Sequence, residues 1–200
     1  MLATLDQQTE AFRQDVLAGL SAPIRAIPAR WLYDQRGSEL FDEITRLPAY
    51  YPTRTETALL EQVMPEIAAL LPKGAAVVEF GAGSATKTPI LLQGIKPAAY
   101  VPVDISRESV LDAARRLQRD YPRLRVRPVC ADFTAPFDLP STVLRNARRR
   151  VVYFPGSTLG NFDQPQAHGL LQSMRHIIGA NGAVLIGIDL KKDPRVLERA

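Results

Sequence analysis

The chain has 200 residues, of which 46% are hydrophobic and 23% are charged, and its formal net charge is +4. This composition is typical of a soluble globular protein, and no apolar stretch approaches the ~20 residues that cross a bilayer, so we expect no membrane association. The start, MLATLDQQTEAF, lacks the basic and apolar segments of a secretory signal, which predicts a cytoplasmic protein. Two histidines and one cysteine cannot build a Cys/His zinc site, and we expect no metal.

The first ~65 residues show helical spacing of apolar side chains rather than strand alternation. A first helix is predicted over 4–20. A second follows Ser38, its expected N-cap, and ends near Pro48. A third begins after a loop, with Thr53 or Thr55 as its cap. Residues 1–72 therefore form a predicted helical extension that contributes to the substrate site, and 73–200 form the core domain.

Beyond residue 74 short apolar runs alternate with helical stretches. Strands are predicted at 76–80, 100–104, 125–130, 150–154 and 183–189. Helices are predicted at 86–94, 107–120, 138–147 and 164–178. Strand and helix in alternation give parallel strands with right-handed crossovers. The fold class expected is α/β, a doubly wound, mostly parallel, Rossmann-like sheet behind the helical extension.

Glycines and acids follow the predicted strands, at the edge where such sheets bind ligands. Gly81 and Gly83 come after the first strand, although a Gly-x-Gly turn is also common in purely structural bends. Asp104 ends the second strand about 20 residues later, where a carboxylate accepts hydrogen bonds from a ribose; it could also cap the next helix. Asp132 and Phe133 end the third strand, at the expected place of an adenine.

This combination is found in S-adenosylmethionine (SAM)-dependent methyltransferases. A nicotinamide dehydrogenase needs an acid and base for hydride transfer, and no histidine lies at a predicted strand end. The glycine and lysine spacing of a phosphate-binding P-loop is absent around Lys87. Cys130, inside a predicted strand, is expected to be a core thiol. The arginines at 148–150 could bind RNA, but without interleaved aromatics we interpret them as a solvated loop and expect no nucleic-acid partner.

Five motifs carry a more specific resemblance. They are RWLYDQRGSELFDEITRLPAYYPTRTE, VEFGAGSATKT, VDIS, CADF and FPGSTLGNF. From about residue 30 to the last residue the chain resembles the histidine Nα-methyltransferase family of ergothioneine biosynthesis, a class I methyltransferase family. The resemblance implies an enzyme that uses SAM to methylate the α-amino group of L-histidine three times.

The resemblance also implies roles for individual residues. The expected cofactor-binding residues are Gly81, Gly83, Lys87, Asp104, Asp132 and Phe133. The expected substrate-binding residues are Tyr50, Tyr51, Gly156 and Asn161, with Tyr50 slightly favoured over Tyr51 as the inward-facing tyrosine. Tyr33 and Tyr50 are the expected catalytic residues. A tyrosine hydroxyl or a water-linked carboxylate would then take the ammonium proton.

The chain stops soon after the fifth predicted strand, where sheets of this class usually continue with an antiparallel pair. We therefore expect a fragment of a longer protein that is a monomer at full length. Two alternatives stay open at this point. The acceptor could be another amino acid or amine, such as a tryptophan derivative, or the chain could be a non-catalytic homologue.

Overall fold

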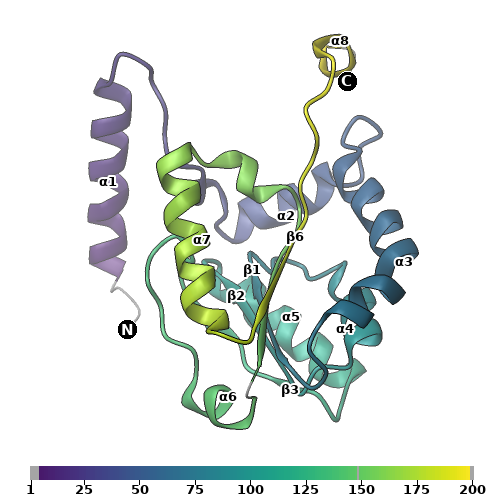
Figure 1. Cartoon of the computed structure of the whole chain (residues 1–200). Coiled ribbons are helices and arrows are strands. Elements are labelled where there is room, and N and C mark those ends of the chain that lie inside the picture. The colour runs from purple at the N-terminus through teal and green to yellow at the C-terminus, as the bar shows by residue number, and fades with distance from the viewer. Residues whose placement is uncertain (1–4, 148, 199–200) are drawn as a thin grey trace.

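The computed structural model describes residues 5–147 and 149–198, and its centre is a parallel sheet (Figure 1). The strands follow the order β3-β2-β1-β5-β6, with β4 also paired to β2. Their bounds are Ala76–Phe80 (β1), Ala99–Asp104 (β2), Arg125–Val126 (β3), Val129–Cys130 (β4), Arg150–Phe154 (β5) and Ala183–Ile186 (β6). Every pairing among them is parallel. The predicted α/β, doubly wound fold class is confirmed.

Both faces of the sheet are apolar and covered by helices. Consecutive residues of β1, such as Val77 and Val78, belong to two separate buried clusters, as the period of two in a strand requires. The helices that follow the sheet strands are α4 (Thr88–Ile95), α5 (Arg107–Asp120), α6 (Ser141–Asn146), α7 (Gln164–Ile178) and the short α8 (Pro194–Leu197). Helices α4 and α5 contribute to the Val77 cluster, and α6 and α7 to the Val78 cluster.

The N-terminal part is helical, as predicted, but its second and third helices begin elsewhere. Its elements are α1 (Leu5–Ser21), the 3-10 helix η1 (Ala29–Leu32), α2 (Gln35–Ile44) and α3 (Pro52–Leu70). Asp34, not Ser38, caps α2, because its side chain accepts a hydrogen bond from Gly37 N at 2.7 Å. Neither Thr53 nor Thr55 caps α3, because Pro52 already opens that helix in the position where its missing N–H is harmless.

Helix α3 belongs to the packing of the core although it precedes the first strand. Leu60 and Met64 are buried in the same cluster as Val77. An added Cβ at Gly94 would lie 2.4 Å from Met64 Cγ, so this glycine allows α3 and α4 to approach closely. The proposed boundary at residue 72 stays a prediction, since α3 packs with both sides of it.

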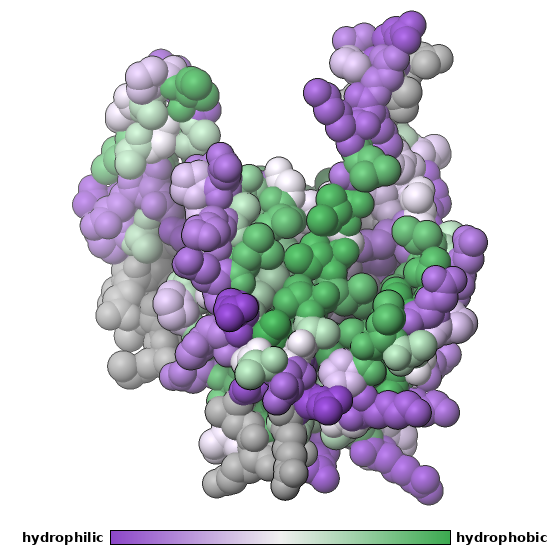
Figure 2. Space-filling model, viewed as in Figure 1, coloured by the Kyte–Doolittle hydropathy of each residue, from purple (hydrophilic) through white to green (hydrophobic). Residues whose placement is uncertain are grey.

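Two strands differ from expectation by more than one residue. The predicted strand at 125–130 is broken into β3 and β4, and Pro128, which has no N–H for the ladder, lies in the interruption. Strand β6 ends at Ile186 rather than at residue 189. Within the described residues, β6 is an edge strand of the sheet. Figure 2 shows green, apolar surface over it. Ile188 and Leu190, just beyond it, are 64% and 79% exposed.

The remaining expectations concern the arginines at 148–150, Cys130 and the membrane. Arg148 lies outside the described residues, and Arg150 is the first residue of β5 rather than a loop residue. Cys130 is half-buried, its thiol donates to Ile105 O at 3.5 Å, and burial raises its pKa, in keeping with a core thiol. Across residues 5–147 and 149–198, no helix has the length and apolar character needed to cross a membrane.

Candidate active site

A cavity of about 1200 Å³ opens at the carboxyl ends of the strands, with the N-terminal segment forming its other wall. In Figure 1 helix α2 crosses above this end of the sheet. Ten of the sequence-predicted site residues line the cavity: Tyr33, Tyr50, Gly81, Gly83, Lys87, Asp104, Asp132, Phe133, Gly156 and Asn161. Tyr51 is not among the lining residues. The volume exceeds that of a typical single-ligand pocket, so it can hold a nucleoside-sized group and a second small molecule together.

The turn after β1 is built from residues with positive φ. Gly81 and Gly83 have φ of 69° and 46°, a region that glycine enters without steric penalty. Gly81 N donates to Val103 O at 2.9 Å, which holds the turn against the end of β2. Ala85, in place of a third glycine, also has positive φ, at 51°. The result is a bend that presents backbone rather than side chains to the cavity.

Asp104 closes the other side of this turn. Its Oδ2 accepts from Gly83 N and its Oδ1 from Ser106 N, each at 2.9 Å. Ser106 caps α5 through its own side chain, so Asp104 is not the helix cap. A carboxylate offers about four acceptor positions, and two backbone bonds leave room for a pair of hydroxyls. Burial raises the pKa of Asp104, against the lowering effect of these backbone bonds.

The segment after β4 places the ring of Phe133 and the carboxylate of Asp132 beside the glycine-rich turn. Phe133 stacks on Phe80 with ring centroids 5.5 Å apart and meets Phe154 edge to face at 5.6 Å. An added Cβ at Gly81 would lie 3.5 Å from the Phe133 ring. Asp132 Oδ1 accepts from Thr134 N and Thr134 Oγ1 at 2.9 and 2.5 Å. The carboxylate is therefore fixed at the edge of the cavity next to an apolar wall.

Glu56 of α3 joins the two halves of the site, and the sequence analysis missed it. Its carboxylate forms an ion pair with Lys87 and accepts from Gly156 N at 2.9 Å. The two charged side chains are 19% and 12% exposed. Gly156 N is thus already bonded inside the protein, which leaves its carbonyl as the group open to a substrate. Contacts across 31 and 100 residues leave no local pattern, and only the motif YYPTRTE contained a signal for Glu56.

Tyr33 and Tyr50 both contact the same aromatic ring, that of Phe41. Phe41 meets each edge to face, at 6.0 and 5.9 Å between centroids. Burial is the main cause of a raised pKa for both tyrosines, with the charge of Asp104 adding to the effect at Tyr33. Both phenols are therefore neutral at physiological pH. They can orient a ligand by hydrogen bonding, but neither is a ready proton acceptor as a phenolate.

An arginine holds the loop that carries Tyr50. Arg54, in the first turn of α3, donates to the carbonyl oxygens of Leu47, Pro48 and Tyr50 at 2.8, 2.6 and 3.0 Å. Its planar guanidinium reaches several acceptors at once, which suits it to tie down a loop. This is a second residue of the motif YYPTRTE to which the sequence analysis assigned no role.

Tyr51 has a different position from its neighbour. Its hydroxyl donates to Asp189, and the ammonium of Lys192 lies 4.7 Å from its ring centroid. Asp189 N in turn donates to Ser157 Oγ at 3.0 Å. Tyr51 therefore ties the start of α3 to the segment after β6. Of the two tyrosines, this geometry favours Tyr50 as the one that faces a ligand.

The turn after β5 supplies the remaining polar group. Asn161 ends the 3-10 helix η2 (Thr158–Asn161) and lines the cavity. Ser157 precedes this helix with φ of 56°, so the chain turns sharply where it leaves the sheet. Asn161 offers both an amide donor and an amide acceptor, which suits the carboxylate and amine of an amino acid.

Glu79 is a buried acid beneath the glycine-rich turn. It is 2% exposed, and its Oε2 accepts from Thr88 Oγ1 at 2.8 Å and from Tyr100 OH at 2.7 Å. Burial raises the pKa of Glu79 to about 7, although both hydrogen bonds act to lower it. Because Glu79 also lines the cavity, its charge changes within the physiological pH range next to the site.

Comparison with known proteins adds a family to this geometry. The sequence profile of a family described as histidine-specific, SAM-dependent methyltransferases matches residues 12–200. The chain is 37% identical to the histidine N-alpha-methyltransferase of Mycolicibacterium smegmatis over 98% of its own length, and 35% identical to that of Mycobacterium tuberculosis over 95%. It spans about three fifths of the length of these relatives, 60% and 59%.

Among solved structures, an O-methyltransferase family protein from Burkholderia thailandensis is similar with a TM-score of 0.54 and 18% identity. The match covers 84% of this chain and 46% of that one, and at this identity it supports the fold alone. Fold, glycine-rich turn and sequence profile agree. The chain belongs to the family of histidine-specific, SAM-dependent methyltransferases.

Proposed function

We propose that the protein transfers methyl groups from SAM to the α-amino group of L-histidine, three times, as a step of ergothioneine biosynthesis. The single observation that carries the proposal is the shared cavity. Cofactor-type groups of the sheet, Gly83 and Asp104, face the same space as Tyr50 and Asn161 of the acceptor side. Family membership and the two mycobacterial relatives named as histidine N-alpha-methyltransferases support the choice of acceptor.

The residues of the sheet edge fit the cofactor. The bend at Gly81 and Gly83 presents backbone to the cavity, and the free acceptor positions of Asp104 suit two ribose hydroxyls. Asp132 and Phe133 provide an acceptor and an apolar wall for an adenine. Lys87 has three N–H donors, of which Glu56 takes one, so it can also hold the carboxylate of the methionine part. When bound, SAM supplies a methyl group on sulfur that an amine can attack.

The acceptor side must present a neutral amine in line with that methyl group, because a protonated nitrogen has no free electron pair. We propose that Tyr33 and Tyr50 orient the amine with neutral hydroxyls, and that desolvation in the cavity lowers the pKa of the ammonium so that its proton leaves to water. In each round the nitrogen forms a bond to carbon while the carbon–sulfur bond breaks and its electron pair stays on sulfur. The first two rounds release a proton from nitrogen, and the third gives a quaternary ammonium.

Two measurements test this function. Titration calorimetry with S-adenosylhomocysteine (SAH) tests the cofactor side, and mass analysis of products from SAM with L-histidine, L-tryptophan and other amino acids tests the acceptor. We expect a trimethylated product from histidine alone. Methylation of another amino acid in preference to histidine would overturn the acceptor, and absence of SAH binding would overturn the whole proposal.

The variant Asn161→Ala tests the acceptor side of the cavity separately from the cofactor side. We expect a raised KM for histidine and nearly unchanged affinity for SAH, because Asn161 lies on the acceptor side of the cavity. Equal losses of both affinities would place Asn161 at the cofactor instead. Within this proposal residues 1–72 supply most of the acceptor wall, while the monomeric state and cytoplasmic location stay predictions from the sequence.

A further inference from the structure

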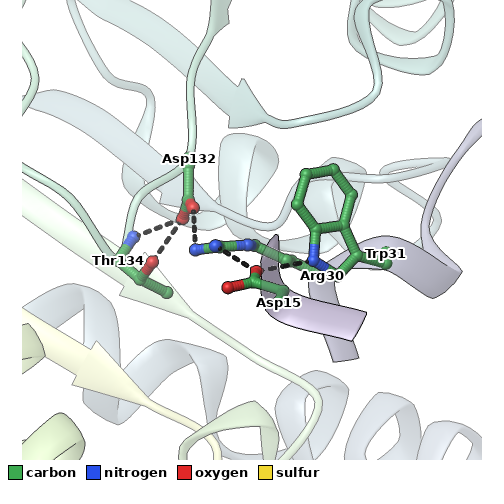
Figure 3. Close-up of polar contacts among 5 residues, drawn as sticks. All are labelled: Asp15, Arg30, Trp31, Asp132 and Thr134. Carbon is green, nitrogen blue, oxygen red and sulfur yellow. Dashed lines mark hydrogen bonds and ion pairs between the residues drawn. The ribbon is translucent and has the colours of Figure 1, made fainter. Parts of the chain in front are cut away.

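We propose that Arg30 is a positioning residue for the adenine end of the cofactor site, and that it couples cofactor binding to the docking of helix α1. The inference rests on the proposed function in one respect, the placement of adenine at Asp132. It concerns the chain Asp15–Arg30–Asp132, which links α1, η1 and the end of β4 (Figure 3). All three side chains line the cavity.

The hydrogen bonds already made by Asp132 define what remains for a ligand. Its Oδ1 is occupied by the N–H and hydroxyl of Thr134, and its Oδ2 accepts from Arg30 Nη1 at 3.3 Å. Of about four acceptor positions on a carboxylate, one is left, on Oδ2. An adenine amino group needs one such acceptor. Arg30 and adenine can therefore bind the same oxygen together, with Arg30 fixing its direction.

Arg30 is itself held from its other end. Its Nη2 donates to Asp15 Oδ2 at 2.6 Å, and the same oxygen accepts from Trp31 Nε1 at 2.7 Å. The guanidinium carbon lies 5.1 Å from the Trp31 ring centroid, within cation–π range. These contacts hold the pKa of Asp15 below its usual value, with the Trp31 bond as the largest cause. Asp15 is thus a permanent anion that orients Arg30 toward Asp132.

Helix α1 is held to the site through this cluster. In Figure 1 it stands at one side of the sheet, joined to η1 by a long connection. Phe12 packs edge to face on Trp31 at 5.2 Å, next to the bonds of Asp15 in the same helix. Phe12, Leu17 and Leu20 are each about half exposed, so little apolar burial adds to this attachment. A small change at Arg30 can therefore shift the equilibrium between docked and undocked α1.

Docking of helix α1 and binding of the cofactor are linked thermodynamically. If adenine binds Asp132 best when Arg30 is in place, cofactor binding favours the docked helix, and docking raises cofactor affinity by the same factor. A guanidinium shared between two carboxylates supplies this link without any contact between α1 and the adenine ring. Arg30 is then responsible for recognition of the adenine amino group, rather than for affinity in general.

The first experiment compares SAH with S-inosylhomocysteine, which carries an oxygen in place of the amino group. Calorimetry on the wild type, Arg30→Gln and Arg30→Lys gives both dissociation constants for each protein. We expect Arg30→Gln to weaken SAH binding about fivefold to tenfold and to reduce the preference for SAH over the inosine analogue. Both effects should be intermediate in Arg30→Lys. Arg36→Gln, on an exposed arginine of α2, is the control and should change neither constant.

The second experiment needs no variant for its main result. Trp31 is the single tryptophan of the sequence, and its indole N–H belongs to the cluster, so its fluorescence reports on the docking of α1. We expect SAH to reduce quenching of Trp31 by acrylamide in the wild type. In Asp15→Ala we expect SAH still to bind but no longer to change the quenching.

The outcomes separate this inference from the function on which it rests. SAH binding by a wild type whose Trp31 quenching does not change, or an unchanged SAH-to-inosine preference in Arg30→Gln, overturns the role of Arg30 and leaves the methyltransferase proposal intact. A wild type that binds no SAH overturns both.

Discussion

The two walls of the cavity are built by different kinds of interaction. The sheet wall depends on backbone groups: Gly81 N bonds to the end of β2, and Asp104 accepts from the N–H groups of Gly83 and Ser106. The N-terminal wall depends on long side chains that reach between elements, as Arg30 does to Asp15 and Asp132. These bonds form as soon as β1, β2 and the glycine-rich turn come together, because backbone N–H groups and a single short side chain make them. Contacts between distant, half-exposed side chains depend on how the elements dock.

This difference predicts where the site is rigid and where it adapts. The β1 strand under the glycine-rich turn is fully buried, whereas α2 has no buried residue and α1 exposes several large apolar side chains. Elements with little burial are the first to open locally. We therefore expect a preformed sheet wall and an N-terminal wall that is completed as ligands bind.

The largest expected effect is at Asp104. Asp104→Ala removes an acceptor of two backbone N–H groups and, in our proposal, of two ribose hydroxyls. Each hydrogen bond to a charged acceptor contributes ~1.5–3 kcal/mol, so SAH affinity should fall by more than tenfold in calorimetry. Glu61→Ala, at an exposed carboxylate of α3, is the control. An unchanged dissociation constant for Asp104→Ala would remove this residue from the site.

The sheet wall was the part of the molecule most open to prediction from sequence. The apolar runs of β1 and β5 and the glycines at 81 and 83 are local signals, and the structure has β1 and β5 at the predicted bounds. The prediction of 125–130 as one strand was wrong, although the sequence contained the signal: Pro128 has no N–H for the ladder, and it lies where the strand is broken. Helix caps were also wrong at α2 and α3, where several polar residues compete within one turn.

The N-terminal wall could be predicted only through family motifs. Tyr33 and Tyr50 were proposed by resemblance, and nothing in their spacing indicates that Phe41 would contact both of them. Glu56 and Arg30 were missed, because their partners are distant in sequence: Gly156 for Glu56, and Asp132 for Arg30. Charged side chains at helix spacing normally indicate a solvated face, and only the docked tertiary structure shows that these two point inward.

The second prediction concerns pH and the buried acid under the turn. Because burial raises the pKa of Glu79 to about 7 from 4.5, the folded protein holds a proton between these values that the unfolded chain releases. The free energy of unfolding should therefore decrease as pH rises through that window, by on the order of 3 kcal/mol, at about 1.4 kcal/mol per pKa unit. Urea unfolding of wild type and Glu79→Gln from pH 4 to 8 measures this. The variant should lose that slope and be the more stable protein above pH 7; parallel curves would contradict the assignment.

The third prediction measures how strongly α3 is tied to the sheet wall. Lys87 and Glu56 are mostly buried, so a double-mutant cycle with Glu56→Gln and Lys87→Met should give a coupling of about 1–2 kcal/mol in urea unfolding. The exposed pair Arg36–Glu39 is the matched control and should couple by less than about 0.5 kcal/mol. Equal couplings for the two pairs would mean that the ion pair adds nothing to the attachment of α3 beyond apolar packing and the hydrogen bond from Gly156 N to Glu56.

The smallest effect is expected at Arg54, and it should be confined to the histidine-binding part of the N-terminal wall. Arg54→Ala removes three hydrogen bonds to the carbonyl oxygens of Leu47, Pro48 and Tyr50, but the freed carbonyls are exposed and can bond to water. Global stability should therefore fall by only about 1 kcal/mol, while amide exchange in the loop at 46–51 speeds up about tenfold. Histidine affinity should weaken severalfold as Tyr50 loses its fixed place, with SAH affinity unchanged.

Arg46→Ala is the control for this last variant, because Arg46 is an exposed arginine of the same loop. Exchange rates and both affinities should match the wild type there. If Arg54→Ala lowers SAH and histidine affinity by the same factor, the two walls of the cavity are one cooperative unit, and the contrast between a preformed sheet wall and an adaptable N-terminal wall is wrong. If only exchange in the loop changes, Tyr50 keeps its position without Arg54, held by its edge-to-face contact with Phe41.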